Sequence, residues 1–315
     1  MTSIEKIPPS QRAKTVSKDS DEGAVREDML QLYRFVIVHC FGIVLSLFIL
    51  SLFIVHCFGI IAAMFDKIYF GPFSISTYTF LLDIGILGTL AWLWWRAKNY
   101  GRESSRWLDA GISVVAGAII GGRFAFAFSN WAYFQNHLLE MFRFWEGGYE
   151  WFGAALGGVI ALAIFCFMRG ESFVMILEEL ALPSLCLFAL HWIVCAASAC
   201  AAGLAVPPGA LPFAMNLPDL YGVTLPRWPA QYIGFALTLI AIGYLISQRN
   251  KNFPSGFRFA LAVTLIAVIS FMVSTVRGDD VQKVGSWRLD TIINMMIIIG
   301  GVAIGVTLVL QPKKI

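Results

Sequence analysis

The chain has 315 residues, of which 58% are hydrophobic and only 14% are charged. With a mean hydropathy of +0.73, this composition excludes an ordinary water-soluble domain and indicates an integral membrane protein. The net charge is only +3 and the basic residues are scattered, so the sequence predicts no nucleic-acid partner.

Residues 1–30 are polar, carry charges of both signs and contain no apolar stretch, which predicts a disordered tail and not a signal peptide. Eight apolar runs follow that are long enough for membrane-spanning helices. They cover residues 35–65, 78–95, 108–128, 151–168, 180–204, 230–246, 259–274 and 291–310. Lys and Arg number 16 on the side that holds both termini, against 6 on the other. Since basic segments stay in the cytoplasm, we expect both termini there and the long loops 129–150 and 205–229 outside.

The first apolar run, 35–65, is unusual in length and content. Its 31 uncharged residues would form a helix about 46 Å long, against a hydrocarbon core of about 30 Å. The heptapeptide IVHCFGI occurs in it twice and places His39 and His56 about 100° apart around the axis. Each of them, and His191 in the fifth run, fits an interhelical hydrogen bond or axial ligation of a haem or chlorophyll-type pigment. Small residues in the run allow close helix contacts, which predicts docking of other membrane protein subunits.

Other polar and sulfur-containing residues give few chemical signals. The six cysteines all lie in apolar runs and form no CxxC pair, so we expect small core residues without a signal of redox compartment. Glu178 and Glu179 stand where the fifth run starts, and negative charge suits a helix N-terminus. Asp83 is a lone carboxylate in the second run, which gives little support to a proton-coupled transporter. No catalytic triad, phosphate-binding loop or metal-binding motif is present in the sequence.

Five short blocks carry a family resemblance: GPFSISTY (71–78), GGRFAFAFSN (121–130), FRFWEGGYEWFGAALGG (142–158), PFAMNLPDLYGVTLPRWPAQ (212–231) and PSGFRFAL (254–261). In order and spacing they resemble prolipoprotein diacylglyceryl transferase, a seven-span bacterial enzyme that moves a diacylglyceryl group from phosphatidylglycerol to a lipobox cysteine thiol. The resemblance implies an all-α integral membrane protein of the bacterial inner membrane. We expect a transferase-like bundle of seven helices over 68–315, preceded by an additional transmembrane helix within 31–67, which gives eight spans.

The resemblance also shows what this chain lacks. Phe152 stands where the family has an essential histidine, and Ala154 replaces a glycine. The segment 189–203 contains neither the arginine nor the asparagine that the family pattern requires there. Other positions at which the family has a histidine, a tyrosine, an arginine and a glutamate are Ser76, Ala262, Ile266 and Ser270. The family residues that remain are Arg123, Glu146, Gly147, Gly148, Pro229 and Gln231.

Two interpretations stay open for each of the polar residues that remain. Arg123 fits contact with a lipid phosphate, or a structural bond to Asp83, Glu178, Glu179 or a backbone carbonyl. Glu146 and Gln231 fit a lipid-headgroup site or ordinary hydrogen bonds at the membrane interface. Because the family's phosphate-binding cations are gone, the sequence favours an inactive relative that binds phospholipid and serves as a structural, accessory or lipid-holding subunit. The alternatives are a working transferase whose essential groups have moved and an unrelated transporter; no catalytic residue, metal or certain cofactor is assigned.

Overall fold

The computed structural model describes residues 67–70, 73–144, 147–209, 212–219, 221–279 and 281–310. The expectations for the tail, for the helix at 35–65, and for His39, His56 and Glu146 therefore lie outside the described residues. Within the described part, seven helices are long and apolar enough to cross a membrane. They are α2 (Thr77–Asn99), α3 (Ser104–Ser129), α5 (Trp151–Arg169), α6 (Phe173–Ala197), α7 (Ala230–Ser247), α8 (Phe257–Ser274) and α9 (Leu289–Leu310). The all-α membrane fold is confirmed, and seven helices lie where the transferase-like bundle was expected.

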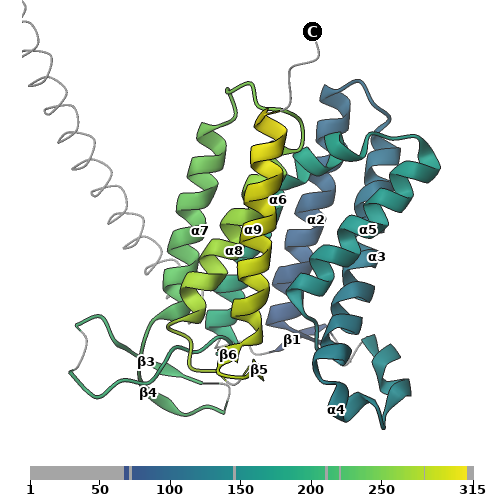
Figure 1. The fold of residues 1–315 in the computed structure, drawn as a ribbon. Coiled ribbons are helices and arrows are strands. Elements are labelled where there is room, and N and C mark those ends of the chain that lie inside the picture. The colour runs from purple at the N-terminus through teal and green to yellow at the C-terminus, as the bar shows by residue number, and fades with distance from the viewer. Residues whose placement is uncertain are drawn as a thin grey trace, which may run out of the picture. The chain divides into compact units, whose positions relative to one another are not determined.

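The connections at one end of the bundle are not plain loops. Three antiparallel hairpins lie there: β1 (Lys67–Phe70) with β2 (Phe73–Ser76), β3 (Met215–Pro218) with β4 (Thr224–Arg227), and β5 (Lys283–Val284) with β6 (Trp287–Arg288). The same end carries the short helix α4 (Trp131–Phe134) and the 3-10 helix η1 (Leu138–Phe142) (Figure 1). We call this end of the bundle the hairpin end. The chain leaves α9 at the opposite end (Figure 1).

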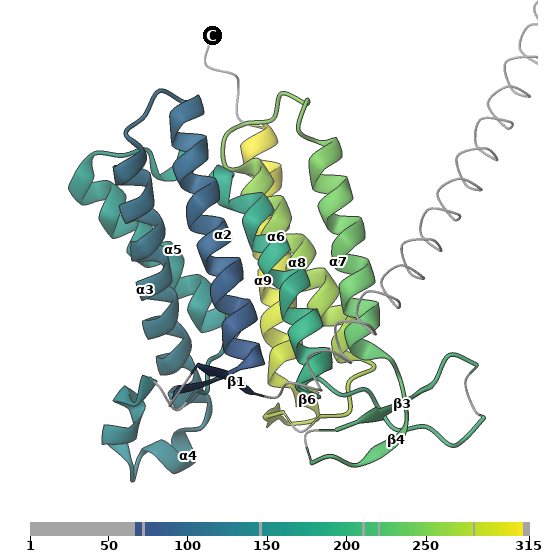
Figure 2. The same ribbon diagram turned by 180° about the vertical axis from the view of Figure 1, so that it is seen from behind.

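The helices pack around two apolar cores. Helices α3 and α5 lie side by side at one edge, α2 and α6 follow, and α7, α8 and α9 complete the bundle (Figure 2). One core joins α6, α7 and α8 through residues such as Leu185, Phe235 and Val273. The other joins α2, α3, α5 and α6 around Leu93 and Trp107. Because lipid tails are as apolar as these side chains, close packing must hold the helices together.

Glycines make the contact between α3 and α5 unusually close. A Cβ atom added to Gly157 would lie 2.2 Å from the carbonyl oxygen of Gly117, and one added to Gly121 would lie 2.3 Å from that of Gly153. These four glycines form a small-xxx-small spacing on each helix, which is the pattern that lets two backbones touch in a membrane. The contact places the middle of α3 against the hairpin-end part of α5.

The prediction for the fifth span, 180–204, is wrong at both ends, because α6 runs from Phe173 to Ala197. It ends early since Ala199 and Ala201 have φ angles of 56° and 52°, a left-handed conformation that α-helices do not contain. The chain then runs from Ala202 to Val206 between α8 and β4, bonded by Leu204 N to Val276 O at 2.9 Å and by Val206 N to Pro226 O at 2.8 Å. This extended segment places residues 198–206 across the hairpin end.

The reading of Glu178 and Glu179 as helix-start residues is also wrong. Both lie beyond the first turn of α6 and join it to other helices at the end away from the hairpins. Glu179 accepts two bonds from Arg96 of α2, at 2.5 and 2.6 Å. Glu178 pairs with Arg258 at 2.9 Å and accepts the backbone N–H of Gly256 at the start of α8. These pairs fix three helices to one another, so their role in the bundle is structural.

Candidate functional site at the hairpin end

Arg123 is the charged side chain placed deepest at the hairpin end, with 3% of its surface exposed. Its guanidinium donates to three backbone carbonyls: Glu140 O at 2.5 Å, Met141 O at 3.1 Å and Gly147 O at 2.5 Å. Of the partners that the sequence left open, the structure selects backbone carbonyls. The charge is thereby satisfied by the chain itself, and the bonds tie α3 to the segment that leads into α5.

The glycine pair 147–148 explains how this segment turns. Gly147 and Gly148 have φ angles of 77° and 74°, which residues with a Cβ atom rarely adopt. A Cβ atom on Gly148 would also meet the ring of Phe126 at 2.6 Å. The turn directs the carbonyl of Gly147 toward Arg123 and ends at Glu150, which precedes α5. The glycines therefore serve backbone geometry.

Four side chains from the segment after α8, from β6 and from the start of α9 form an ion cluster at this end. Arg277 pairs with Asp279, and Arg288 bonds both Asp279 and Asp290 at 3.2 Å. Arg277 also lies 3.9 Å from the Asp290 carboxylate. Burial opposes ionisation of Asp279, but its bonds to Arg277 and the charges of both arginines outweigh burial and hold the pKa of this carboxyl below its usual range. The cluster is not among the features predicted from the sequence, although its two Arg-x-Asp triplets are a usable signal.

Glu150 faces the ion cluster from the start of α5. Desolvation raises the pKa of Glu150, the negative charge of Asp290 raises it further, and the charge of Arg277 offsets only part of this increase. Glu150 therefore adds the start of α5 to the cluster, without an ion pair of its own among the described residues.

His191 and two cysteines lie beside these groups. Cys195 and Cys200 form a disulfide, so the expectation that all cysteines are plain core residues is wrong. His191 stacks on Phe188 with 6.1 Å between ring centroids, and its Nε2 lies 3.8 Å from the sulfur of Cys195. This nitrogen is directed at a sulfur atom, which gives no support to axial ligation of a pigment. Among the described residues, no three His, Cys, Asp or Glu side chains gather in a way that would hold a metal ion.

Gln231 lies at the start of α7 with 3% of its surface exposed. Its Nε2 donates to the carbonyl oxygen of Cys200 at 2.8 Å, while its Oε1 has no partner among the described atoms. Gln231 thus fastens the disulfide-bonded turn to α7. The structure places Arg123 and Gln231 at the same end of the bundle, but each is bonded to a different backbone segment.

Two further arginines complete the hairpin end. Arg227 of β4 pairs with Asp219 at 2.8 Å and donates to Gly203 O at 3.3 Å. Arg143 lies 3.6 Å from Glu140. Each arginine that the structure describes at this end is therefore bound to an oxygen of the protein.

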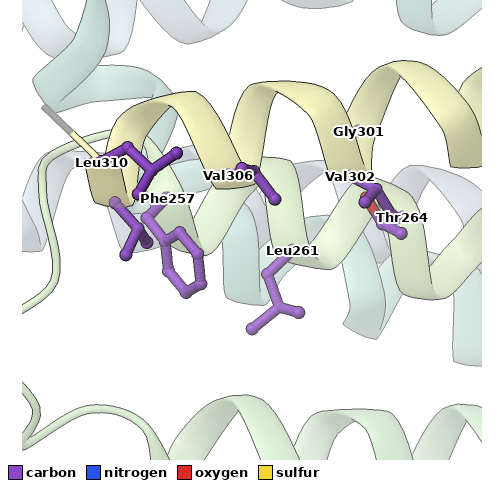
Figure 3. Close-up of a pocket in the computed structure, with 9 residues that line it drawn as sticks. Phe257, Leu261, Thr264, Gly301, Val302, Val306 and Leu310 are labelled. Atoms are coloured by element: carbon purple, nitrogen blue, oxygen red, sulfur yellow. The ribbon is translucent and has the colours of Figure 1, made fainter.

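A groove of about 330 Å³ lies far from these charges, between α8 and the last three turns of α9. Figure 3 shows its wall of apolar side chains, among them Phe257, Leu261, Val302 and Val306. The hydroxyl of Thr264 is bonded to Ala260 O at 2.7 Å, so it offers little polarity to the groove. Such a surface suits a hydrocarbon chain and contains no cation for a headgroup.

Comparison with known proteins identifies the family. The family model for prolipoprotein diacylglyceryl transferase matches residues 66–307. The chain belongs to this family. It is 25% identical to phosphatidylglycerol–prolipoprotein diacylglyceryl transferase 2 of Clostridium perfringens over 73% of this chain and 89% of that protein. A relative from Caldanaerobacter subterraneus is 27% identical over 60% of this chain and 68% of that protein. One from Legionella pneumophila is 35% identical over 33% of this chain and 42% of that protein.

Some positions at which the resemblance implies polar side chains in the family lie here in packed apolar surroundings. Ala262 is fully buried and Ile266 is 9% exposed, both within the core of α6, α7 and α8. Trp192, in the segment that lacks the family arginine and asparagine, is 2% exposed and packs on Gly234 of α7. Apolar side chains pack closely at these positions.

Proposed function

We propose that this chain is a catalytically inactive member of the transferase family that serves as a structural or lipid-holding subunit of a larger membrane complex. The observation that carries the proposal is the state of the arginines at the hairpin end. Those described are each bonded to a carbonyl or carboxylate of the protein: Arg123, Arg143, Arg227, Arg277 and Arg288. A phosphate is best recognised by forked cationic donors, and here it would have to displace those oxygens.

The chemistry of the family points the same way. Transfer of a diacylglyceryl group to a thiol requires a base for the thiol and donors that stabilise the leaving phosphate. By resemblance, the positions of an essential histidine and arginine are held by Phe152 and Ile266, neither of which can donate or accept a proton. Removing one transition-state donor typically lowers the rate about 10²–10³-fold. With several removed, we expect no measurable transfer.

The lipid-holding part of the proposal rests on the bilayer-facing surface of the bundle. The α8–α9 groove offers apolar walls to an acyl chain and has no charged residue that would select one headgroup. The relatives named above are phosphatidylglycerol-dependent by name, and we propose that this chain retains phospholipid as a bound partner without converting it.

We further propose that the segment 35–65 docks other membrane subunits and that the hairpin end faces outward, with both termini cytoplasmic. The excess of Lys and Arg near the termini supports this orientation. The Cys195–Cys200 disulfide at the hairpin end supports it too, since disulfides persist in oxidising compartments. A reporter that is active only in the cytoplasm, fused after residue 315, should be active; an inactive fusion of full-length protein would contradict the orientation.

A second function is favoured by one specific observation. Arg277, Arg288, Glu150 and His191 all stand at the hairpin end, so a working transferase with relocated cations and a relocated base is the alternative. In that case Asp279 and Asp290 would have to release the arginines when phospholipid binds.

Complementation of a bacterium depleted of its own transferase separates the two proposals. The full chain is expressed beside the Clostridium perfringens relative as positive control, and its presence in the membrane is verified by immunoblot. We expect no rescue and no transfer of labelled diacylglycerol to a lipobox peptide. Rescue that disappears on replacing both Arg277 and Arg288 by Gln would establish the relocated site and overturn the inactive reading.

A further inference from the structure

The Cys195–Cys200 disulfide has features that a purely structural cross-link does not need. It joins residues only five positions apart, and a cross-link that closes so short a loop removes less entropy from the unfolded chain than one that closes a long loop. The turn is also held without it. Gln231 bonds the carbonyl of Cys200, and Gly278 N donates to Ala202 O at 2.9 Å.

The two sulfurs have different surroundings. Cys195 is 2% exposed and lies in the core of α6, α7 and α8. Cys200 is half-buried and follows the exposed Ser198 in the turn. A thiol that arrives at the hairpin end therefore meets the sulfur of Cys200 first, and Cys195 becomes the leaving group.

A histidine side chain lies beside the leaving sulfur. The Nε2 atom of His191 lies 3.8 Å from the sulfur of Cys195, and the stacked ring of Phe188 holds the imidazole in place. Thiol–disulfide exchange is faster when the departing thiolate is stabilised. An imidazole N–H at this position donates a hydrogen bond to that thiolate and so stabilises it.

The backbone of the turn favours opening of the disulfide. Ala199 and Ala201, one on each side of Cys200, are both left-handed, although a side chain with a Cβ atom disfavours that conformation. Strain of this kind persists only where the surroundings enforce it, and it gathers at functional sites. Release of Cys200 from Cys195 would let the turn relax while Gln231 keeps it attached to α7.

We propose that Cys195–Cys200 is a thiol–disulfide exchange site for a cysteine-type thiol presented at the hairpin end. The incoming thiolate, its proton lost to solvent, attacks the sulfur of Cys200. The bond between the two protein sulfurs breaks, and its electron pair stays on Cys195. The imidazole N–H of His191 donates a hydrogen bond to this thiolate, which then takes a proton from solvent. The products are a mixed disulfide on Cys200 and a free Cys195 thiol. Attack by Cys195 on the mixed disulfide reverses the step, so no other oxidant or reductant is consumed.

The test uses the full-length protein in lipid nanodiscs and glutathione as the thiol. After a timed incubation, free thiols are blocked with N-ethylmaleimide and the adducts are located by peptide mass spectrometry. We expect glutathione on Cys200 and maleimide on Cys195. In His191→Phe, which keeps a ring to stack on Phe188, the exchange rate should fall about tenfold. His137→Phe, which alters a histidine of the same end bonded to Tyr133 O, should leave the rate unchanged.

Three outcomes would overturn the proposal. One is a disulfide that glutathione opens only after denaturation. Another is an adduct that forms on Cys195 instead of Cys200. The third is a His191→Phe protein that exchanges as fast as wild type. The wild-type adduct map depends on no substitution, so it decides the site even where a variant fails to fold.

Discussion

The bonds of Arg123 show how a single buried charge can be satisfied by main-chain groups alone. The guanidinium meets three carbonyls of the segment 140–147 and lies within 6 Å of the rings of Phe126 and Phe134. Bonds to a charged donor are stronger than those between neutral groups. The residue thus holds η1 and the glycine turn against α3.

We expect Arg123→Gln to destabilise the protein by about 3 kcal/mol, since charged hydrogen bonds are lost and buried carbonyls stay unpaired. For a bundle of this size, that corresponds to a fall of about 6–12 °C in the apparent Tm, measured by thermal unfolding in detergent. Arg143→Gln is the matched control, because Arg143 is half exposed in its pair with Glu140 and should cost less than about 1 kcal/mol. Equal Tm values for the two variants would refute the role of Arg123.

At the residue scale, the sequence singles out Arg123 as a cation inside a span. It does not predict which group accepts the hydrogen bonds of Arg123. A backbone carbonyl is an acceptor at every residue, so no side-chain pattern reveals which carbonyls converge on a cation. The disulfide escapes prediction for a related reason. Cys195 and Cys200 lie in an apolar alanine-rich run that resembles a continuing helix, and in a continuous helix the two sulfurs would not face each other. Only the left-handed alanines bring them together.

Among the helices, the α3–α5 contact is the least tolerant of change. The α-carbons of Gly121 and Gly157 lie where a single methyl group would overlap the opposite helix: the added Cβ of Gly157 falls 2.9 Å from the Cα of Gly121. The obstructing atoms belong to backbone, which cannot turn aside as a flexible side chain does.

Gly157→Leu should therefore separate α3 from α5 and destabilise the bundle by about 3 kcal/mol or more, at the upper end for overpacked cores. Gly88→Leu in α2 is the control, since an added Cβ there meets nothing within 4 Å. Size-exclusion profiles and apparent Tm in detergent are the measurements. A monodisperse Gly157→Leu protein with unchanged Tm would show that α3 and α5 can separate without loss of stability.

Helix positions follow well from apolar run length wherever a polar turn bounds the run. The sixth run, 230–246, matches α7 to within one residue because Pro229 precedes it and polar residues follow. The fifth run failed since its polar pair, Glu178 and Glu179, lies inside the helix and is neutralised by arginines of α2 and α8. Hydropathy measures the free energy of transferring a side chain into lipid. It does not show whether a charged side chain will form an ion pair inside the bundle.

For the molecule as a whole, the family match begins at residue 66 and the described bundle contains its own apolar cores. We therefore expect deletion of residues 1–65 to leave a protein that inserts into the membrane and unfolds with an apparent Tm close to that of the full chain. If the deleted segment docks partner subunits, as proposed above, the truncated protein should no longer co-purify with them. Retention of the full set of partners would show that the docking surface lies in the bundle.

The ion cluster at the hairpin end could be predicted from the sequence only in part. Arg277 and Asp279, like Arg288 and Asp290, are two positions apart in the sequence and within reach of local inference. Glu150 and His191 come from distant segments, and their approach depends on how α5 and α6 pack. Tertiary packing decides this, which is why the cluster was found only in the structure.

The close glycine contact between α3 and α5 also has a consequence for the insertion of the chain into the membrane during synthesis. The two helices are separated in the chain only by α4, η1 and the glycine turn. Their contact can therefore close as soon as α5 has entered the bilayer, before α6 to α9 have entered it. A closely packed pair of neighbouring spans offers a rigid surface against which each later helix can pack. Order of synthesis and order of assembly then coincide, and a nascent chain stalled just after α5 has entered the bilayer should already hold a paired hairpin of helices.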